Sequence, residues 1–122
     1  MRLIDTNIIL RYVLEDNEEL FEEAEKIIDE GGFAVPEVIA EVVYVLTKVY
    51  GIEKPDVCST LRDLMDDIEI TGSDSANEVM LEAISIYEQR ALDFVDCILI
   101  ARNHILGDEV LSFDEKLNKQ LQ

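Results

Sequence analysis

Short apolar runs alternate with longer segments of helical periodicity along the whole chain. The short runs predict strands at 2–4, 33–35, 68–71 and 110–113. Apolar positions at helical spacing predict helices at 8–14, 17–30, 36–50, 54–67, from 73 or 74 to 90, 93–106 and 115–121. This alternation is typical of a parallel sheet covered by helices. With 122 residues, 48% of them hydrophobic, the chain is expected to fold as one α/β domain over residues 1–122.

Four carboxylates stand where the pattern is otherwise apolar. Asp5 follows the first predicted strand and Asp114 follows the fourth. Glu41 and Asp96 lie inside helical segments rich in valine, isoleucine and alanine. Because burying an unpaired carboxylate is costly, four of them in apolar settings are expected to share a counter-charge. A divalent cation is the simplest candidate.

The predicted topology brings these acids to one edge of the sheet. Asp5 and Asp114 come directly after parallel strands, and ligands bind outside the carboxyl ends of such strands. Glu41 lies in the second turn of the helix after the second strand, near the same rim. Asp93 and Asp96 are three positions apart in a first helical turn and share a face. Carboxylates without cysteine or histidine favour Mg²⁺ or Mn²⁺ over zinc, and such a site can hydrolyse phosphodiesters without a protein nucleophile.

Each of these acids also has a purely structural interpretation. Asp5 and Asp114 are placed to cap the helices that follow them. Asp93 is more readily explained as a helix cap than as a direct metal ligand, and Asp96 as a first-turn acid that answers the helix dipole. For Glu41 the alternative is a buried, protonated side chain. The only histidine, His104, is expected on the surface rather than in a catalytic role.

The net charge of −18, from 28 acidic and 10 basic residues, changes the choice of partners. So acidic a chain does not bind nucleic acid by passive electrostatic attraction. An RNA substrate would be attracted only where a metal ion and a few bases meet, with Arg11, Lys48 and Lys116 as candidates. A basic polypeptide is therefore the more favourable partner.

Cysteine usage and the absence of targeting signals predict the compartment. Cys58 and Cys97 are too few and too embedded in helical patterns for a disulfide framework or a zinc site. The sequence shows neither a signal peptide nor an apolar run long enough to span a membrane. A reducing cytoplasm is the expected location.

Four motifs occur in order across essentially the whole chain. They are Asp5-Thr6-Asn7 after the first strand, Val35-Pro36 followed by Glu41, Asp93-Phe94-Val95-Asp96 before an apolar run, and Leu111-Ser112-Phe113-Asp114. Each is weak alone, but the set resembles the PIN domain family, most closely the toxin subunits of VapBC-type toxin–antitoxin pairs.

The resemblance implies a three-layer fold with a parallel sheet of four or five strands flanked by helices, and a metal-dependent ribonuclease site. It places the family's acidic positions on Asp5, Glu41, Asp96 and Asp114, and the supporting polar positions on Thr6, Asn7, Asp93 and Ser112. The family usually has a short fifth strand after the fourth acid, whereas only eight residues follow Asp114 here, so the sheet is expected to lack one edge. The resemblance also implies a homodimer and an antitoxin partner.

The expected function is therefore a Mg²⁺- or Mn²⁺-dependent endoribonuclease that leaves a 5′-phosphate and a 3′-hydroxyl, inhibited by a basic antitoxin. Three alternatives remain open. The first is a PIN scaffold without nuclease activity that acts through protein binding, and the second is a free-standing RNA-processing nuclease. The third, a phosphatase with an aspartyl nucleophile, is disfavoured because Asn7 stands where such enzymes typically place a second aspartate.

Overall fold

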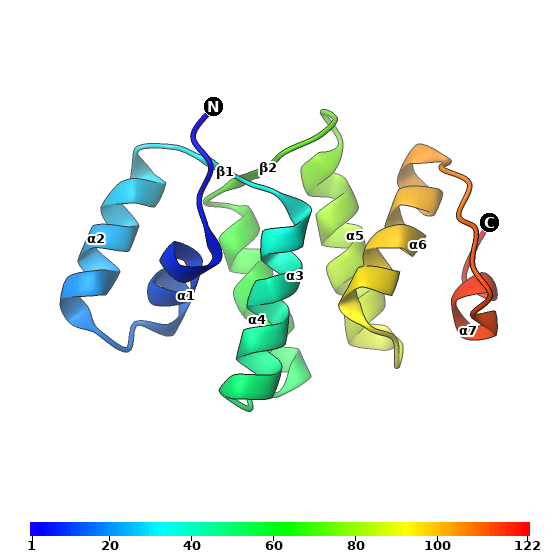
Figure 1. The fold of residues 1–122 in the computed structure, drawn as a ribbon, viewed down its shortest axis with the longest axis horizontal. Coiled ribbons are helices and arrows are strands. Elements are labelled where there is room, and N and C mark those ends of the chain that lie inside the picture. Colours follow the sequence, from blue (N-terminus) through cyan, green and yellow to red (C-terminus); the bar gives the residue numbers. More distant parts are fainter.

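The computed structural model describes residues 1–122 and shows helices packed around a very small sheet (Figure 1). In chain order the elements are α1 (Thr6–Leu14), α2 (Glu18–Asp29), β1 (Phe33–Ala34), α3 (Pro36–Tyr44), η1 (Val45–Val49), α4 (Lys54–Met65), β2 (Glu69–Ile70), α5 (Ala76–Gln89), α6 (Phe94–Leu106) and α7 (Glu115–Asn118). The helices begin and end within a few residues of the ranges that the apolar pattern predicted. None of them combines the length and the apolar composition needed to cross a lipid bilayer.

The sheet is parallel and consists of β1, β2 and one bridge to the N-terminal segment. Phe33 lies opposite Glu69, and Ala34 lies opposite Ile70. On the other side of β1, Leu3 bridges Phe33, with the N–H of Ile4 donating to the Phe33 carbonyl at 2.8 Å. The first three predicted strand positions are therefore neighbours, although each is shorter than its apolar run.

The outer edge of β2 is closed by a side chain instead of another strand. Asn77, in the first turn of α5, accepts a hydrogen bond from the N–H of Ile70 at 2.8 Å. Its amide nitrogen donates to the carbonyls of Ile68, at 3.2 Å, and Met65, at 3.4 Å. The side chain of Asn77 thus gives the backbone groups at this edge the hydrogen-bond partners that a further strand would otherwise provide.

The predicted strand at 110–113 does not join this sheet, and no fifth strand forms from the last eight residues. Residues 107–114 run along the outer side of α6, which separates them from the N-terminal segment (Figure 1). Leu111 is 84% exposed and Phe113 is fully exposed. The β-type composition of this run therefore does not make it a strand here, because a strand also needs an adjacent backbone for its hydrogen bonds.

The helices enclose a core that is entirely apolar. All 26 buried residues are hydrophobic, and 23 of them form one cluster drawn from the sheet and from α1 to α6. α5 packs along α6 on one side and against α4 on the other (Figure 1). No carboxylate is buried in this core, which bears directly on the candidate site.

The C-terminal part of α3 continues as a π-helix, η1. The N–H of Tyr50 donates to the Val45 carbonyl at 3.1 Å, which is a five-residue turn. The hydroxyl of Thr47 donates to the carbonyls of Val43 and Tyr44, at 2.8 and 3.2 Å. Such back-bonding competes with the regular helix ladder and accompanies its widening here.

Candidate active site

Asp5 ends the N-terminal segment and caps α1. Its Oδ1 atom accepts hydrogen bonds from the N–H groups of Asn7, at 3.0 Å, and Ile8, at 3.2 Å. This is the helix-cap role that the sequence left open for Asp5. The carboxylate is exposed, so the cap and a second role at the surface are compatible.

Thr6 connects this carboxylate region to Glu41. The Thr6 hydroxyl donates to Oε2 of Glu41 at 3.2 Å, which joins the start of α1 to the second turn of α3. The structure therefore brings Asp5, Thr6 and Glu41 to one place, although Thr6 and Glu41 are 35 residues apart in the sequence.

The interpretation of Glu41 as a buried carboxylate is wrong. Glu41 is exposed, while Ile39, Val42 and Val43 on the same helix are buried. An apolar segment of helix buries the stripe that faces the core and leaves the remaining positions outside. The burial argument for a shared counter-charge therefore fails for Glu41, and it also fails for Asp5 and Asp114, which are exposed.

Asp96 is the one candidate carboxylate that is partly buried. It lies in the first turn of α6, and its pKa is raised, first by burial and then by the negative charges of Asp93 and Asp114. Asp93 occupies the N-cap position of α6, but its side chain makes no capping hydrogen bond. The side chain of Asp93 therefore does not cap α6. Its negative charge instead contributes to the raised pKa of Asp96.

Asp114 caps the short helix α7. Its Oδ1 accepts from the N–H groups of Lys116, at 2.9 Å, and Leu117, at 3.3 Å. The hydroxyl of Ser112 accepts from the N–H of Asp114 at 2.9 Å, so Ser112 fixes the backbone that carries this acid. Like Asp5, Asp114 combines a cap with an exposed carboxylate.

The candidate acids form two groups within one chain rather than one metal site. Asp5 and Glu41 are linked through Thr6, and Asp96 experiences the charges of Asp93 and Asp114. Their oxygens are the donors that Mg²⁺ and Mn²⁺ prefer. Nevertheless, no three His, Cys, Asp or Glu side chains are close enough together to hold a metal ion. The carboxylate oxygens are suitable donors for a divalent cation, but in this structure the side chains are too far apart to hold one.

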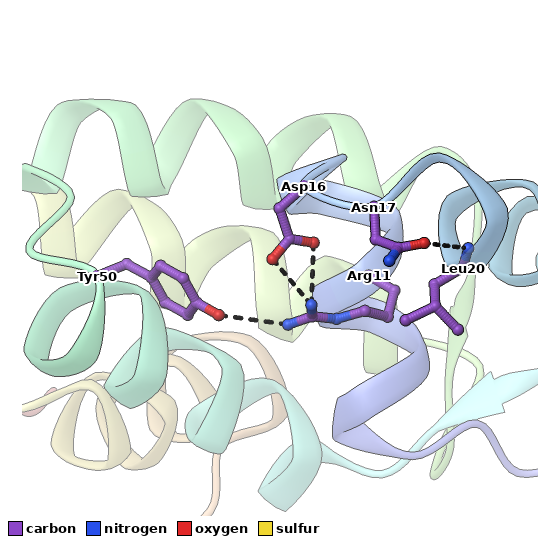
Figure 2. Close-up of polar contacts among 5 residues, drawn as sticks. All are labelled: Arg11, Asp16, Asn17, Leu20 and Tyr50. Carbon is purple, nitrogen blue, oxygen red and sulfur yellow. Dashed lines mark hydrogen bonds and ion pairs between the residues drawn. The ribbon is translucent and has the colours of Figure 1, made fainter.

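Arg11, which the sequence suggested as an attraction for RNA, is held by other residues. Its Nη1 bonds to both carboxylate oxygens of Asp16, at 2.8 and 2.9 Å, and its Nη2 donates to the hydroxyl of Tyr50 at 3.3 Å (Figure 2). The bond to Tyr50 is the largest of the effects that raise the pKa of Arg11. Beside this group, Asn17 caps α2 through a 3.0 Å bond from the N–H of Leu20 (Figure 2). Arg11 thus has a structural role, tying α1 to the α1–α2 turn and to the residue after η1.

The other two candidate bases differ from each other. Lys116 donates to the carbonyl of Ala91 at 3.4 Å. Lys48 makes no ion pair or hydrogen bond and lines a groove of about 520 Å³ together with Tyr44, Lys54 and Asp93. This groove was not recognised from the sequence, because Lys54 and Asp93 are far apart along the chain. Lys48 is the base best placed to meet an anion beside the candidate site.

His104 does not lie on the open surface as expected. It is half-buried, with Nε2 at 2.6 Å from the carbonyl of Gln120 and Nδ1 at 3.4 Å from Oε2 of Glu82. The first contact attaches the C-terminal segment to α6, and the second joins α6 to α5. His104 therefore has a structural role, and it forms no hydrogen bond with any of the candidate acids.

Comparison with known proteins identifies relatives over nearly the whole chain. The family model described as PIN domain matches residues 2–120. A protein of Aquifex aeolicus (strain VF5) named VapC ribonuclease is 30% identical over 126 aligned positions, which cover 98% of this chain and 91% of the relative. No solved structure matches the chain.

Proposed function

The chain belongs to the PIN domain family, and from this premise we propose that it is a Mg²⁺- or Mn²⁺-dependent endoribonuclease, the toxin of a toxin–antitoxin pair. The name of the Aquifex relative supports the ribonuclease activity. The observation that carries the proposal is the Thr6–Glu41 hydrogen bond, because it joins two of the four motifs at one exposed, acidic place next to the Asp5 cap. The proposed location is the cytoplasm, where substrate RNA is made.

The proposal assigns two kinds of role to the residues of the motifs. Asp5, Glu41, Asp96 and Asp114 are the acidic ligands, and Thr6, Asn7, Asp93 and Ser112 are positioning residues. Thr6 orients Glu41 through its hydroxyl, and the N–H of Asn7 orients Asp5. Ser112 fixes the backbone of Asp114. A divalent cation held by the four acids would supply activation of water and neutralisation of charge on the phosphate.

RNA approaches this acidic protein most favourably along the groove that contains Lys48. The groove includes Tyr44, which is 61% exposed and offers an aromatic face to an unstacked base. Asp93 lines the same groove, so a strand that lies in it reaches the acids at the start of α6. Tight or processive binding is not expected at a net charge of −18.

Metal binding and cleavage test the proposal together. Mg²⁺ or Mn²⁺ should raise the melting temperature of the protein by mass action, and Asp96→Asn should reduce that rise. Asp63→Asn is the matched control, because Asp63 is an exposed aspartate on α4 whose side chain makes no hydrogen bond or ion pair. An equal response to metal in wild type and in the Asp5→Asn, Asp96→Asn double variant would contradict the site.

Product analysis tests the chemistry. Fragments should carry a 5′-phosphate and a 3′-hydroxyl, and His104→Ala should leave cleavage nearly intact while Asp5→Asn abolishes it. Fragments that end in a 2′,3′-cyclic phosphate would refute water as the nucleophile. If the protein binds metal but cleaves no RNA in any assay, the alternative of a scaffold without nuclease activity replaces the proposal.

The proposed partners are a second copy of the chain and an antitoxin with a basic segment. A basic side chain entering the acidic site would take the place of the metal's charge. Antitoxin binding should weaken steeply as salt shortens the Debye length below ~10 Å. An affinity independent of salt, or a neighbouring gene product that is acidic and fails to inhibit, would favour a free-standing RNA-processing nuclease.

A further inference from the structure

The groove that contains Lys48 differs in charge from the acidic surface around it. Its charged side chains are Lys48, Lys54 and Asp93, so two bases and one acid line it in a chain of net charge −18. By contrast, the hollow of about 610 Å³ beside β2 is lined by four acids and no base. An anionic ligand is therefore repelled from the rest of the surface and attracted to the groove.

Segments far apart in the sequence build this groove at one end of the molecule. Lys48 comes from η1, Lys54 from the start of α4, Tyr87 from the last part of α5, and Asp93 from the position before α6. These helix ends gather at the lower edge of the view in Figure 1. Because the first turn of α6 also carries Asp96, a ligand in the groove lies next to one of the candidate acids.

Lys54 is held in one orientation by two contacts. Its ammonium group donates to the carbonyl of Arg90 at 3.1 Å and lies 4.4 Å from the centre of the Tyr87 ring. The Tyr87 ring in turn meets the ring of Phe94 edge to face, with 5.3 Å between the ring centres. An ammonium group has three donors, so a donor of Lys54 remains for a ligand in the groove. A lysine that is already oriented loses less side-chain entropy when it binds an anion.

The other charged and aromatic side chains of the groove are free to bind a ligand. Among the lining residues only Thr47 and Lys54 form side-chain hydrogen bonds, so Tyr44, Lys48 and Asp93 have no partner within the protein. The remaining walls are mostly apolar. Apolar walls with a few polar groups are typical of small-ligand sites, and the groove volume of about 520 Å³ is within their usual range of ~300–1,000 Å³.

We propose that the groove is a subsite for one unstacked nucleotide next to the cleaved bond, with Lys54 as its principal phosphate-binding residue. Tyr44 and Lys48 are four positions apart and both line the groove, so the base of this nucleotide stacks on Tyr44 while Lys48 adds a second positive charge near its phosphate. Asp93 repels the phosphate, which therefore lies toward the two lysines.

This inference rests on the proposed function for its role in catalysis, but the binding itself requires neither a metal ion nor cleavage. A nucleoside 5′-monophosphate carries the same base and phosphate as one nucleotide of RNA. It should therefore occupy the groove by itself and compete with the RNA substrate.

Titration of the metal-free protein with adenosine, adenosine 5′-monophosphate and inorganic phosphate, followed by NMR, tests the subsite without reference to activity. The monophosphate should bind more tightly than either of the other two ligands. Lys54→Met should weaken monophosphate binding by ~10-fold and leave adenosine binding unchanged, because only the phosphate contact is lost. Tyr44→Ala should weaken the binding of adenosine and of its monophosphate by the same factor, at least ~5-fold, because both lose the stacking contact.

Lys26→Met is the matched control for charge. Lys26 is an exposed lysine on α2 that makes no ion pair or side-chain hydrogen bond, and its replacement changes the net charge by the same amount. Equal weakening by Lys26→Met and Lys54→Met would mean a general charge effect and would refute the subsite. If Lys54 only ties α4 to the end of α5, Lys54→Met lowers the melting temperature without weakening the monophosphate, which also refutes it. Should Lys54→Met fail to fold, Lys48→Met carries the same test, because Lys48 makes no contact that the fold requires.

Cleavage of a short single-stranded RNA separates this inference from the proposed function. Lys54→Met should raise KM by ~10-fold with little change in kcat, because the lost contact is made equally in the ground state and the transition state. Adenosine 5′-monophosphate should inhibit the wild type competitively. If Asp5→Asn is inactive while Lys54→Met retains the KM of the wild type, the subsite is refuted and the proposed function stands. If the wild type cleaves no RNA but binds the monophosphate through Lys54 and Tyr44, the proposed function is refuted and the nucleotide site stands.

Discussion

Removing the side chain of Asn77 should destabilise the protein more than removing the helix cap at Asp5. Asn77→Ala leaves the N–H of Ile70, a residue only 5% exposed, without its 2.8 Å acceptor. It also removes the donor to the carbonyls of Ile68 and Met65. The change therefore reopens the closed edge of the sheet without removing any core hydrocarbon.

The size of the effect follows from these three bonds. An unsatisfied buried N–H costs about 1–3 kcal/mol, and the two longer bonds add about 1 kcal/mol together, which predicts a loss of roughly 2–4 kcal/mol. In a chain of this length each kcal/mol lowers the melting temperature by about 4 °C, so Asn77→Ala should melt roughly 8–16 °C below wild type.

Urea unfolding followed by circular dichroism measures this loss, and hydrogen exchange locates it. The amide of Ile70 should lose protection more than the amides of α4. Gln89→Ala is the matched control, since Gln89 is an exposed amide at the other end of α5 and makes no side-chain hydrogen bond. A loss below about 0.5 kcal/mol, within the range of ordinary surface substitutions, would show that the edge of β2 is satisfied in another way.

Three further predictions concern the acids and the cysteines. Asp5→Ala should cost about 1 kcal/mol in thermal unfolding because the cap of α1 is lost, whereas Asp5→Asn keeps the cap and should lose only activity; equal stabilities would contradict the capping role. Since the raised pKa of Asp96 makes its ionised form unfavourable in the folded state, the metal-free protein should lose stability as pH rises through that pKa, and Asp96→Asn should be more stable than wild type at pH 7 but not in strong acid. Urea titrations across pH measure this difference, and a variant that is less stable at neutral pH would contradict it. Burial raises the pKa of Cys97 to about 12, so a thiol reagent at pH 8 should modify it only after unfolding, and rapid labelling of the native protein would show that α6 opens.

The helices were predictable from sequence because their signals are local. Pro36 marks the first turn of α3, and Gly107 ends α6 with φ of 74°. The exposure of Glu41 was not predictable from composition, since the local run is almost wholly apolar and only the orientation of α3 decides which positions face outward. The two caps at Asp5 and Asp114 were anticipated as alternatives to chemistry, and the structure shows that both acids serve as caps.

Pairing between distant segments was the least predictable part. The apolar run at 110–113 has the same local signal as residues 33–35, but only the latter has neighbours on both sides. The role of Asn77 was also hidden, because an asparagine in the first turn of a helix carries no local sign that it bonds a strand. The gathering of the candidate acids depends on the same long-range pairing, and where the sequence predicted one cleft the structure shows two groups.

The π-helix at the end of α3 makes this region tolerant of the loss of one residue. A π-turn contains one residue more than the α-helical turn it replaces, so deletion of one residue from Val45–Val49 would restore a regular helix. The N–H of Tyr50 would then meet the Val45 carbonyl as an ordinary α-helical bond, and Tyr50 would keep its orientation toward Arg11. The same deletion in the regular part of α3 would instead rotate the rest of the helix by about 100° and turn Tyr50 away from Arg11. Among relatives, a one-residue gap should therefore preserve the arginine–tyrosine pair when it falls within 45–49 and coincide with its loss when it falls within 36–44.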